Sequence, residues 1–531
     1  MVQKGKFADC AFAFDKQLNK VDFPTFGKPT IPHFKAILRI FCEQRYKESR
    51  LSEPRKVLDF NSTNDSRGFW LFLWQNSLMK HLLSVCILSL STVLFGQDSL
   101  MIRSIYDEAL LRGESYENLR QLCKNIGPRL SGSSEAQMAV EWSQAKMNTY
   151  GFDRVYLQEI KVPHWERGTK ESAWFRTSDG QLTKVHLLAL GGSIGTNGTM
   201  EGEVIEFKTI DELKKAKPSK IKGKIVFLNQ AMDATQIQTF KAYGACYAIR
   251  GNGAVEAGKL GAKAVIIRSL GLPEDVHPHT GSMHYEDSVE RIPAGALATA
   301  DASALSAALA KGSVRFIFEM DCRVFPDATS YNVIAEIRGS EKPEEIIVFG
   351  GHLDSWDAGE GAHDDGAGVI HCLEALRILK VLNYKPKHTL RVVFFMNEEN
   401  GNMGGKSYAS IVKSAGEKHI AALESDRGGF VPRGFGVDGS DAQVAFLQTF
   451  APNYKNYDLH VFEKGYGGVD IGPLKEQYPG IPLFGFVPDS QRYFDYHHAP
   501  SDVFESVNKR ELELGAAAIS SFIYLLDLKM K

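Results

Sequence analysis

The sequence has few cysteines, and no two of them are spaced for metal binding. The seven cysteines are Cys10, Cys42, Cys86, Cys123, Cys246, Cys322 and Cys372. The absence of a Cys-x-x-Cys pair argues against a cysteine-based zinc site and a thioredoxin-like redox motif. Whether a disulfide forms among the last four cysteines stays open, because sequence alone cannot pair them.

The chain also lacks an excess of charge of either sign. It has 62 Lys and Arg against 64 Asp and Glu, which gives a formal net charge of −2. This balance provides no general attraction for nucleic acid or for an anionic membrane surface, so neither is expected as a partner. The hydrophobic fraction of 44% and the charged fraction of 24% are typical of a globular protein.

The apolar run at residues 82–95 is shorter than the roughly twenty residues that a helix needs to cross a bilayer. It follows Met79, Lys80 and His81 and precedes Gly96, which is the arrangement of a secretory signal peptide. We therefore predict a signal peptide at 79–96, export to the periplasm or the extracellular space, and no stable membrane insertion after cleavage.

Residues 1–78 show no convincing periodicity and no usable motif. We predict that the natural start is Met79 and that 1–78 is an upstream extension of the reading frame without an assigned fold. The alternative is a genuine extension that makes residues 69–95 an internal anchor, with Trp70 and Trp74 at its edge.

The 531 residues are enough for two or three domains. Ser133 or Ser134 is placed to cap a helix that follows it. Residues 165–325 alternate short β runs with Gly-rich turns and small helices, which indicates a β-rich module inserted into a larger domain. We therefore predict a larger domain in two parts, 97–164 and 326–531, interrupted by an insert at 165–325.

Beyond residue 330, strand-like and helix-like stretches alternate. The strand candidates are SYNVIAEI, EEIIVFG, TLRVVFFM and HIAALESD, and the helix candidates are GAGVIHCLEALRILKV and GGKSYASIVKSA. This alternation predicts an α/β fold whose mostly parallel central sheet is flanked by helices. In such sheets, ligands bind at the carboxyl ends of the strands.

Ionisable side chains gather where these predicted strands end. They are His352 and Asp354, Asp364 and Asp365, Glu398 and Glu399, Glu424 and Asp426, and His497, His498 and Asp502. Because carboxyl ends of parallel strands meet at one edge, we expect these groups to converge. Zinc requires such nitrogen and oxygen donors, and two ions sharing a carboxylate could activate water for hydrolysis. Cobalt or manganese would bind similar donors.

Five motifs in this order, HLDSWDAGEGAHDDGAGV, FFMNEENGNMGGKSYA, ESDRGG, GGVDIGPL and HHAPSD, resemble the co-catalytic zinc aminopeptidase family. Within it they are most similar to the carboxypeptidase Q branch, over about residues 98–531. The resemblance implies the zinc aminopeptidase fold, a catalytic role for the larger domain, and a protease-associated-like insert at 165–325. Residues 1–78 have no counterpart in the family pattern.

The resemblance further implies two Zn²⁺ ions per chain. The implied metal ligands are Asp364 as the bridge, His352 and Asp426 at one ion, and Glu399 and His498 at the other. Glu398 would be the general base, and Asp354 would orient His352, as metal-bound imidazoles generally require. Burial would raise the pKa of Glu398 and the dications would lower it, and sequence does not decide between them.

Neighbouring side chains compete for these roles. Asp365 is an alternative bridge to Asp364, and His497 is an alternative to His498. We prefer His498 because the family ligand lies four residues before an Asp, here Asp502. The other candidates are His363 as a less favoured ligand than Asp364, His371 as a structural residue, Glu424 as support for Asp426, Asp470 in a loop near the site, and Asp357, Glu360, Arg427 and Tyr496 as pocket residues.

GGSIG, residues 191–195, matches the G-x-S-x-G nucleophile elbow of serine hydrolases. That elbow needs a helix directly after it, and the following TNGTMEGEV is poor helix material. We therefore expect a glycine-rich turn at Ser193 rather than a nucleophile. Asn61 and Asn197 begin glycosylation sequons by pattern.

The leading hypothesis is an exported di-zinc metallopeptidase that hydrolyses dipeptides or removes the N-terminal residue of short peptides. The carboxypeptidase Q branch favours dipeptides, and the broader family makes an aminopeptidase the close alternative. Two other classes stay open: a glutaminyl cyclase-like transferase on the same fold, which would use one zinc, and a non-catalytic binding ectodomain. A short peptide is the expected partner, and a homodimer stays open.

Overall fold

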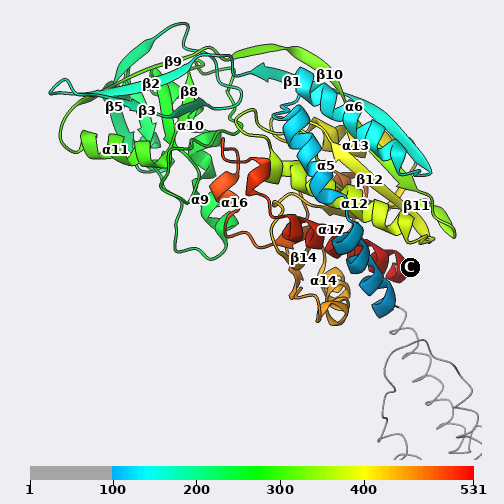
Figure 1. The fold of residues 1–531 in the computed structure, drawn as a ribbon. Coiled ribbons are helices and arrows are strands. Elements are labelled where there is room, and N and C mark those ends of the chain that lie inside the picture. Colours follow the sequence, from blue (N-terminus) through cyan, green and yellow to red (C-terminus); the bar gives the residue numbers. More distant parts are fainter. Residues whose placement is uncertain (1–97, 531) are drawn as a thin grey trace, which may run out of the picture. The chain divides into compact units, whose positions relative to one another are not determined.

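The computed structural model describes residues 98–530 of the chain. These residues form two eight-stranded sheets with helices packed against them (Figure 1). The predicted signal peptide at 79–96, the extension at 1–78 and the sequon at Asn61 lie outside the described residues. Within the part of the chain that is described, no helix is both long and apolar enough to cross a membrane.

The first sheet is built from the two ends of the described chain. Its strands are β1 (Arg154–Glu166), β10 (Arg323–Ile337), β11 (Lys342–His352), β12 (His388–Phe395), β13 (Lys418–Glu424), β14 (Pro432–Asp438), β15 (Val461–Lys464) and β16 (Leu483–Pro488). Their order in the sheet is β1-β10-β12-β11-β13-β16-β14-β15. The central strands β12, β11, β13 and β16 are mutually parallel, and antiparallel pairs join β10 and β14 to them. The predicted α/β fold class is confirmed.

Helices cover both faces of this sheet. The first face carries α5 (Ser115–Gln121), α6 (Ser134–Thr149), α12 (Ala367–Val381) and α17 (Lys509–Lys529), and the second carries α13 (Met403–Ser414) and α15 (Leu474–Gln477). Alternate residues of β10 enter the two cores, Val333 the first and Ile334 the second. Because the sheet is covered on both faces, all of β12 is buried, as its continuous apolar run predicts.

The predicted N-cap accounts for where α6 begins. The Ser133 hydroxyl accepts a hydrogen bond from the backbone N of Ala136 at 3.0 Å, so α6 begins where its cap predicted. The remaining elements of this part are helical residues 98–112, η1 (Leu122–Ile126), η2 (Ala362–Gly366), α14 (Asp441–Gln448), η3 (Ala451–Tyr454), α16 (Tyr493–Tyr496) and η4 (Phe504–Ser506).

The second sheet comes entirely from residues between β1 and β10. Its strands are β2 (Glu171–Thr177), β3 (Leu182–Val185), β4 (Leu187–Ala189), β5 (Met200–Phe207), β6 (Ile225–Leu228), β7 (Ala264–Arg268), β8 (Ala294–Leu297) and β9 (Val314–Met320). Their order in the sheet is β3-β2-β9-β5-β6-β7-β8-β4. Strands β5 to β8 are parallel. The helices of this segment are α7 (Ile210–Lys214), α8 (Pro218–Ile221), α9 (Thr239–Gly251), α10 (Gly253–Lys259) and α11 (Thr299–Leu309). We call residues 171–320 the second lobe; the insert boundaries at 165–325 stay a prediction.

A long antiparallel ribbon joins the two sheets. β1 and β10 pair from Arg154 opposite Glu336 to Glu166 opposite Arg323. The chain leaves the first sheet along β1, builds the second lobe, and returns along β10 (Figure 1). The second lobe is therefore attached through both of its ends.

The cysteines of the described chain are all reduced. Cys123, Cys246, Cys322 and Cys372 are free and buried, so the disulfide that the sequence left open is not formed among them. Burial raises the pKa of Cys123 to about 12 and that of Cys322 to about 11, and both therefore remain thiols.

Asp527 of α17 is a buried carboxylate that fixes the start of β12. Its oxygens accept hydrogen bonds from the backbone N and Nδ1 of His388, from the backbone N of Lys387, all at 2.9 Å, and from the Tyr384 hydroxyl at 2.5 Å. Asp527→Ala should lower the free energy of unfolding by about 3 kcal/mol, because buried donors lose their acceptor. Urea denaturation measures this loss. The control D287N, at a fully exposed position, should keep the wild-type midpoint, and a wild-type midpoint in D527A would contradict the prediction.

His419 is buried as a neutral imidazole. Its Nε2 accepts a hydrogen bond from the Tyr408 hydroxyl at 2.7 Å, and burial, together with the charge of Arg391, lowers the pKa of His419 to about 3. In the unfolded chain this imidazole takes up a proton near pH 6.5, so acid favours the unfolded state. His419→Gln should therefore relieve about 2 kcal/mol of the stability loss between pH 7.5 and pH 5.

Urea unfolding of both proteins across this pH range measures the difference. From pH 7.5 to pH 8.5 the two pH profiles should run parallel, because the imidazole is neutral in both states there. Profiles that stay parallel down to pH 5 would show that His419 does not carry the effect.

Candidate metal centre

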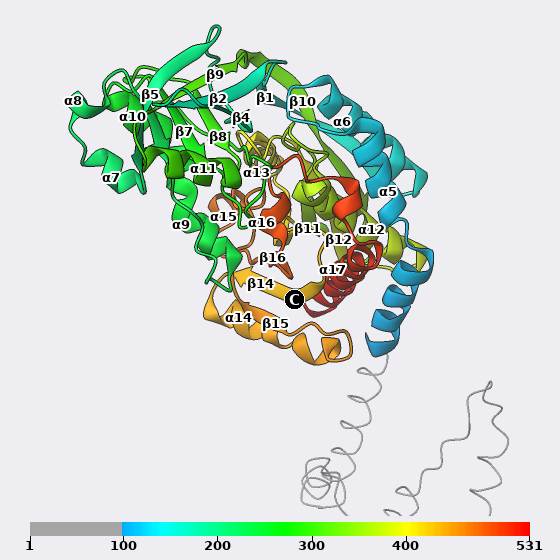
Figure 2. The same cartoon turned by 60° about the vertical axis from the view of Figure 1, so that its left-hand side comes forward.

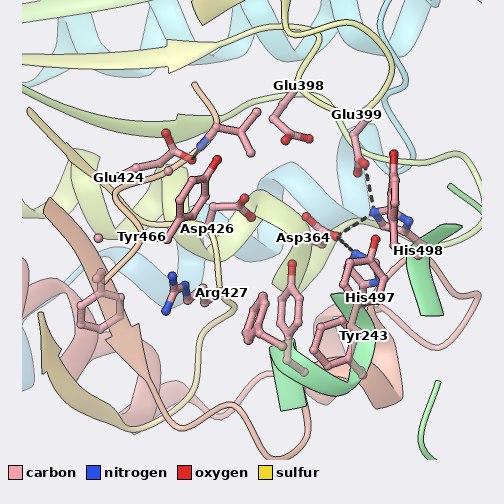
Figure 3. Close-up of a pocket in the computed structure, with 18 of the residues that line it drawn as sticks. Tyr243, Asp364, Glu398, Glu399, Glu424, Asp426, Arg427, Tyr466, His497 and His498 are labelled. Carbon is pink, nitrogen blue, oxygen red and sulfur yellow. Dashed lines mark hydrogen bonds and ion pairs between the residues drawn. The ribbon is translucent and has the colours of Figure 1, made fainter. Parts of the chain in front are cut away.

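Three strand ends and two loops bring the predicted ligands to one edge of the first sheet. β11 ends at His352, Glu399 follows β12, and Asp426 follows β13. Asp364 lies in η2, directly before α12, and His498 follows α16. Figure 2 shows α16 next to α9 of the second lobe, and Figure 3 shows the side chains of the cavity that both helices line.

Asp364 lies between two imidazoles. Its Oδ1 is 3.2 Å from Nε2 of His352, and its Oδ2 is 3.3 Å from Nε2 of His498. Each imidazole nitrogen also faces a second carboxylate, Asp426 at 3.5 Å from His352 and Glu399 at 3.1 Å from His498. The five side chains therefore divide into two groups of donors that share Asp364. Figure 3 shows Asp364 beside His498 and Glu399.

These spacings suit tetrahedral zinc. Two donors bound about 2.0 to 2.2 Å from one tetrahedral ion lie about 3.3 to 3.6 Å apart. The four nitrogen–oxygen separations around Asp364 are 3.1 to 3.5 Å, close to this spacing. Three groups of side chains bring their donor atoms close enough to hold a metal ion: His352 with Asp364 and Glu399, Asp364 with His497 and His498, and His352 with Asp365 and Asp426.

Opposite charges compensate one another within this buried cluster. Burial alone would lower the pKa of His352, but Asp364 and Asp426 raise it well above its usual range. Burial likewise opposes the proton on His498, yet Glu399 and Asp364 raise its pKa to about 9. Burial would raise the pKa of Asp364, and the two imidazoles hold it well below its usual range. Protonated imidazoles thus supply the positive charge that a dication would supply in their place.

Glu398 faces the cavity without a hydrogen bond to its carboxylate among the described residues. Burial raises its pKa well above the usual value, and the charges of Asp426 and Glu399 raise it further. The carboxylate of its neighbour Glu399 lies against His498 instead, so the two adjacent glutamate side chains have different surroundings. A carboxylate that lines the cavity and favours its protonated form is suited to accept a proton.

Asp354 holds two parts of the site together. Its carboxylate accepts hydrogen bonds from the backbone N of Asn397, Glu398 and Glu399 at 2.7, 3.1 and 3.3 Å. Its backbone carbonyl lies 2.9 Å from Nδ1 of His352, whereas its carboxylate is 3.8 Å from that nitrogen. Asp354 therefore orients His352 through the main chain and shapes the glutamate loop through its side chain.

Asp365, the alternative bridge, is engaged by the backbone. Its carboxylate accepts hydrogen bonds from the backbone N of His352 at 3.0 Å and of Gly368 at 3.1 Å. A Cβ at Gly351 or Gly368 would lie 2.2 Å from an oxygen of Asp365, so this close approach requires glycine at both positions. Part of the glycine content of this segment thus accommodates one buried carboxylate.

His497, the alternative to His498, also approaches Asp364. Its Nε2 is 3.7 Å from Asp364 Oδ2, and its ring stacks on that of His498 at 3.5 Å. His498 contacts two carboxylates at shorter distances, which favours it as the ligand. Burial lowers the pKa of His497 well below its usual range, so this ring is neutral.

The other candidates have mostly structural contacts. The ring of His363 stacks on Phe430 at 4.3 Å, and His371 lies 3.2 Å from the Ser425 hydroxyl. Glu424 accepts backbone hydrogen bonds from Val469 and Ile471 at 2.8 and 2.9 Å. The remaining placements are Asp470, buried with no hydrogen-bond partner for its carboxylate among the described residues, Asp357 paired with Arg167, Glu360 paired with Lys124, Tyr496 stacked on His363, and Arg427 at the cavity wall.

Ser193 has no access to a substrate. Its buried hydroxyl donates a hydrogen bond to the carbonyl of Ile194 and accepts one from the backbone N of Ala294, both at 2.9 Å. No helix follows it, so the structure has the expected turn rather than a nucleophile elbow. Asn197 lies exposed in the loop that follows.

The second lobe forms one wall of the cavity. The sequence left open that the insert shapes the substrate mouth, but it did not identify the residues that do so. The cavity has a volume of about 450 Å³, and four residues of α9 line it, Phe240, Tyr243, Tyr247 and Arg250. These aromatic positions are spaced at three and four residues, which places them on one helical face. That spacing was a usable signal, but it does not tell which surface the face meets.

The second lobe also contacts a predicted ligand directly. The backbone N of Thr280 donates to the carbonyl of His498 at 3.0 Å, and the Thr280 carbonyl lies 3.3 Å from Nδ1 of His498. His279 Nδ1 lies 2.7 Å from the carbonyl of His497, and Arg250 Nη1 lies 3.3 Å from Nδ1 of His498. A carbonyl at Nδ1 leaves Nε2 free to face the carboxylates, as a metal-bound imidazole requires. No sequence signal points to these contacts.

Comparisons with known proteins show which family this chain is similar to. The model of Peptidase family M28 matches residues 332–523. Carboxypeptidase Q of Bos taurus is 34% identical over 429 residues, covering 80% of this chain and 88% of that protein. The crystal structure of a peptidase M28 precursor from Shewanella amazonensis SB2B superimposes with a TM-score of 0.77 at 33% identity, covering 82% of this chain and 97% of that one.

A more distant likeness supports the fold alone. A zinc aminopeptidase from Bacillus subtilis gives a TM-score of 0.55 at 20% identity and covers 77% of this chain and 93% of its own. The resemblance to the co-catalytic zinc aminopeptidases, and to the carboxypeptidase Q branch among them, is confirmed. The chain belongs to peptidase family M28.

Proposed function

We propose that this zinc-dependent exopeptidase holds two zinc ions and hydrolyses dipeptides or the N-terminal residue of short peptides. The observation that carries the proposal is the position of Asp364, whose two oxygens each face a different pair of imidazole and carboxylate. A carboxylate in that position is suited to bridge two ions. His352 and Asp426 would complete one site, and Glu399 and His498 the other.

Two zinc ions bound here would lower the pKa of a water molecule and polarise the scissile carbonyl. Glu398 accepts the proton of the attacking water and passes it to the leaving amine. Its place at the cavity and its raised pKa support both steps, because a carboxylate whose pKa is raised takes up a proton more readily than an ordinary glutamate. Tyr466 also lines the cavity, and its hydroxyl is available as a donor to the developing oxyanion.

The cavity favours short substrates. Its volume of about 450 Å³ lies within the range of small-molecule sites, and the wall formed by α9 lies opposite the carboxylates. Phe240, Tyr243, Tyr493 and Phe494 supply apolar surface for a substrate side chain. Residues 171–320 would thus act as an inserted lobe that encloses the substrate. Export directed by 79–96 is part of the proposal and rests on the sequence.

The ligand assignment predicts different outcomes at adjacent histidines. His498→Ala should lower bound zinc from about two ions per chain to about one, because one ion loses its only imidazole. His497→Ala should retain about two. Elemental analysis of the purified proteins, together with peptide cleavage before and after removal of metal by a chelator, tests the assignment. Loss of zinc in H497A alone would transfer the ligand role to His497, and cleavage that survives metal removal would refute the mechanism.

The base assignment predicts a defect in turnover. Glu398→Gln should lower kcat by about 100- to 10,000-fold, because the amide cannot accept the proton of the attacking water. Zinc content and KM should stay near the wild-type values. Steady-state kinetics on a dipeptide, with E463Q at the exposed Glu463 of β15 as the control, measures the effect. Wild-type turnover in E398Q would exclude this residue as the base.

A further inference from the structure

Arg427 is a guanidinium without a partner in an acidic cavity. It lines the cavity together with Asp364, Glu398, Glu399, Glu424 and Asp426. Within residues 98–530 its guanidinium donates no hydrogen bond and forms no ion pair; its described contact is with the ring of Phe240. Burial lowers the pKa of Arg427, which nevertheless remains charged. A partly desolvated charge without a partner is unfavourable, so this position is suited to an anion.

The second guanidinium of the cavity is already engaged. Arg250 donates to the Tyr243 hydroxyl at 2.6 Å and to the Thr280 carbonyl at 3.4 Å. Its Nη1 also lies 3.3 Å from Nδ1 of His498. Among the described residues that line the cavity, Arg427 is therefore the arginine that is available to a ligand.

Aromatic packing holds Arg427 in place. Its Cζ lies 5.1 Å from the centre of the Phe240 ring, and that ring stacks on Tyr493 at 5.2 Å. Contact with a ring face leaves the N–H groups at the edge of the guanidinium free for hydrogen bonds. A planar guanidinium can donate two parallel hydrogen bonds to the two oxygens of a carboxylate.

The position of Arg427 selects which carboxylate can reach it. The carboxylates that line the cavity would repel a free inorganic anion, whereas a peptide carries its own carboxylate in beside a neutral amide. Arg427 directly follows Asp426, so their Cα atoms are about 3.8 Å apart, the length of one residue. In Figure 3 Arg427 lies on the far side of Asp426 from Glu398 and Glu399. In a dipeptide the free carboxylate lies one residue beyond the scissile carbonyl.

We propose that Arg427 binds the C-terminal carboxylate of a dipeptide and thereby makes the enzyme a dipeptidase. This inference rests on the proposed exopeptidase function and identifies the residue that sets substrate length. A longer peptide or a C-terminal amide places a neutral group where the guanidinium requires a carboxylate. The preference for a dipeptide is therefore a preference for charge at that position.

Kinetics on a matched pair of substrates tests the proposal. The zinc-loaded wild type, R427Q, R427K and the control R433Q are compared on alanyl-leucine and on alanyl-leucinamide. Arg433 is a suitable control because it pairs with Asp489 at 3.0 Å and does not line the cavity. R427Q should lower kcat/KM for the dipeptide by about 10- to 150-fold, mainly through KM, and leave cleavage of the amide unchanged. The kcat/KM of R427K for the dipeptide should lie between the values of the wild type and R427Q, because lysine keeps the positive charge but lacks the planar guanidinium.

The possible results distinguish the role of Arg427 from the proposed exopeptidase function on which it rests. Equal losses on both substrates, or no loss on either, would overturn the role of Arg427 while leaving the exopeptidase function intact. A zinc-loaded wild type that cleaves neither substrate would overturn the function and the inference together. Zinc content of each variant shows whether the adjacent Asp426 is disturbed. If R427Q loses zinc, R427K carries the test, and a dipeptide-specific loss in it supports the proposal.

Discussion

The position of the Asp364 carboxylate between two imidazoles is the constraint on which the rest of the site depends. The turn that carries it is fixed from outside, because Asp502 accepts the backbone N–H groups of His363 and Asp364 at 2.7 and 3.1 Å. Arg129 holds the same turn by donating to the Gly361 carbonyl at 3.0 Å. Since each oxygen of Asp364 serves a different imidazole, a displaced turn would damage both donor groups at once.

The concentration of carboxylates explains why the site needs positive charge inside it. Buried carboxylates that face one another raise each other's pKa, and uncompensated burial would leave them protonated. Asp364 instead stays ionised because protonated His352 and His498 flank it. Dications would take over this compensation and release the imidazole protons, so metal affinity is expected to increase with pH. The same charges that bind metal thus define the state of the cluster without it.

The sequence predicted what is encoded locally. Strands β10 to β13 follow from apolar runs, and ligand candidates follow from polar groups directly after those runs, since parallel strands end at one edge. Contacts between remote segments were not predictable. The contact between Thr280 and His498 joins residues that are 218 positions apart in the sequence. On the Thr280 side it uses main-chain N–H and carbonyl groups, which every residue except proline has, so the residue type gives no signal. The aromatic face of α9 was readable as a helical stripe, but its partner surface depends on how the two lobes pack.

The packing of the lobes therefore joins the proposed substrate pocket to the proposed metal ligands. α9 supplies the Phe240 ring that holds Arg427, and its Arg250 lies against the His498 ring. The loop at Thr280 fixes His498 through backbone hydrogen bonds. A movement of the second lobe would widen the cavity and at the same time release a ligand of one donor group. We therefore expect that opening these lobes to admit a much larger substrate would weaken the proposed metal site.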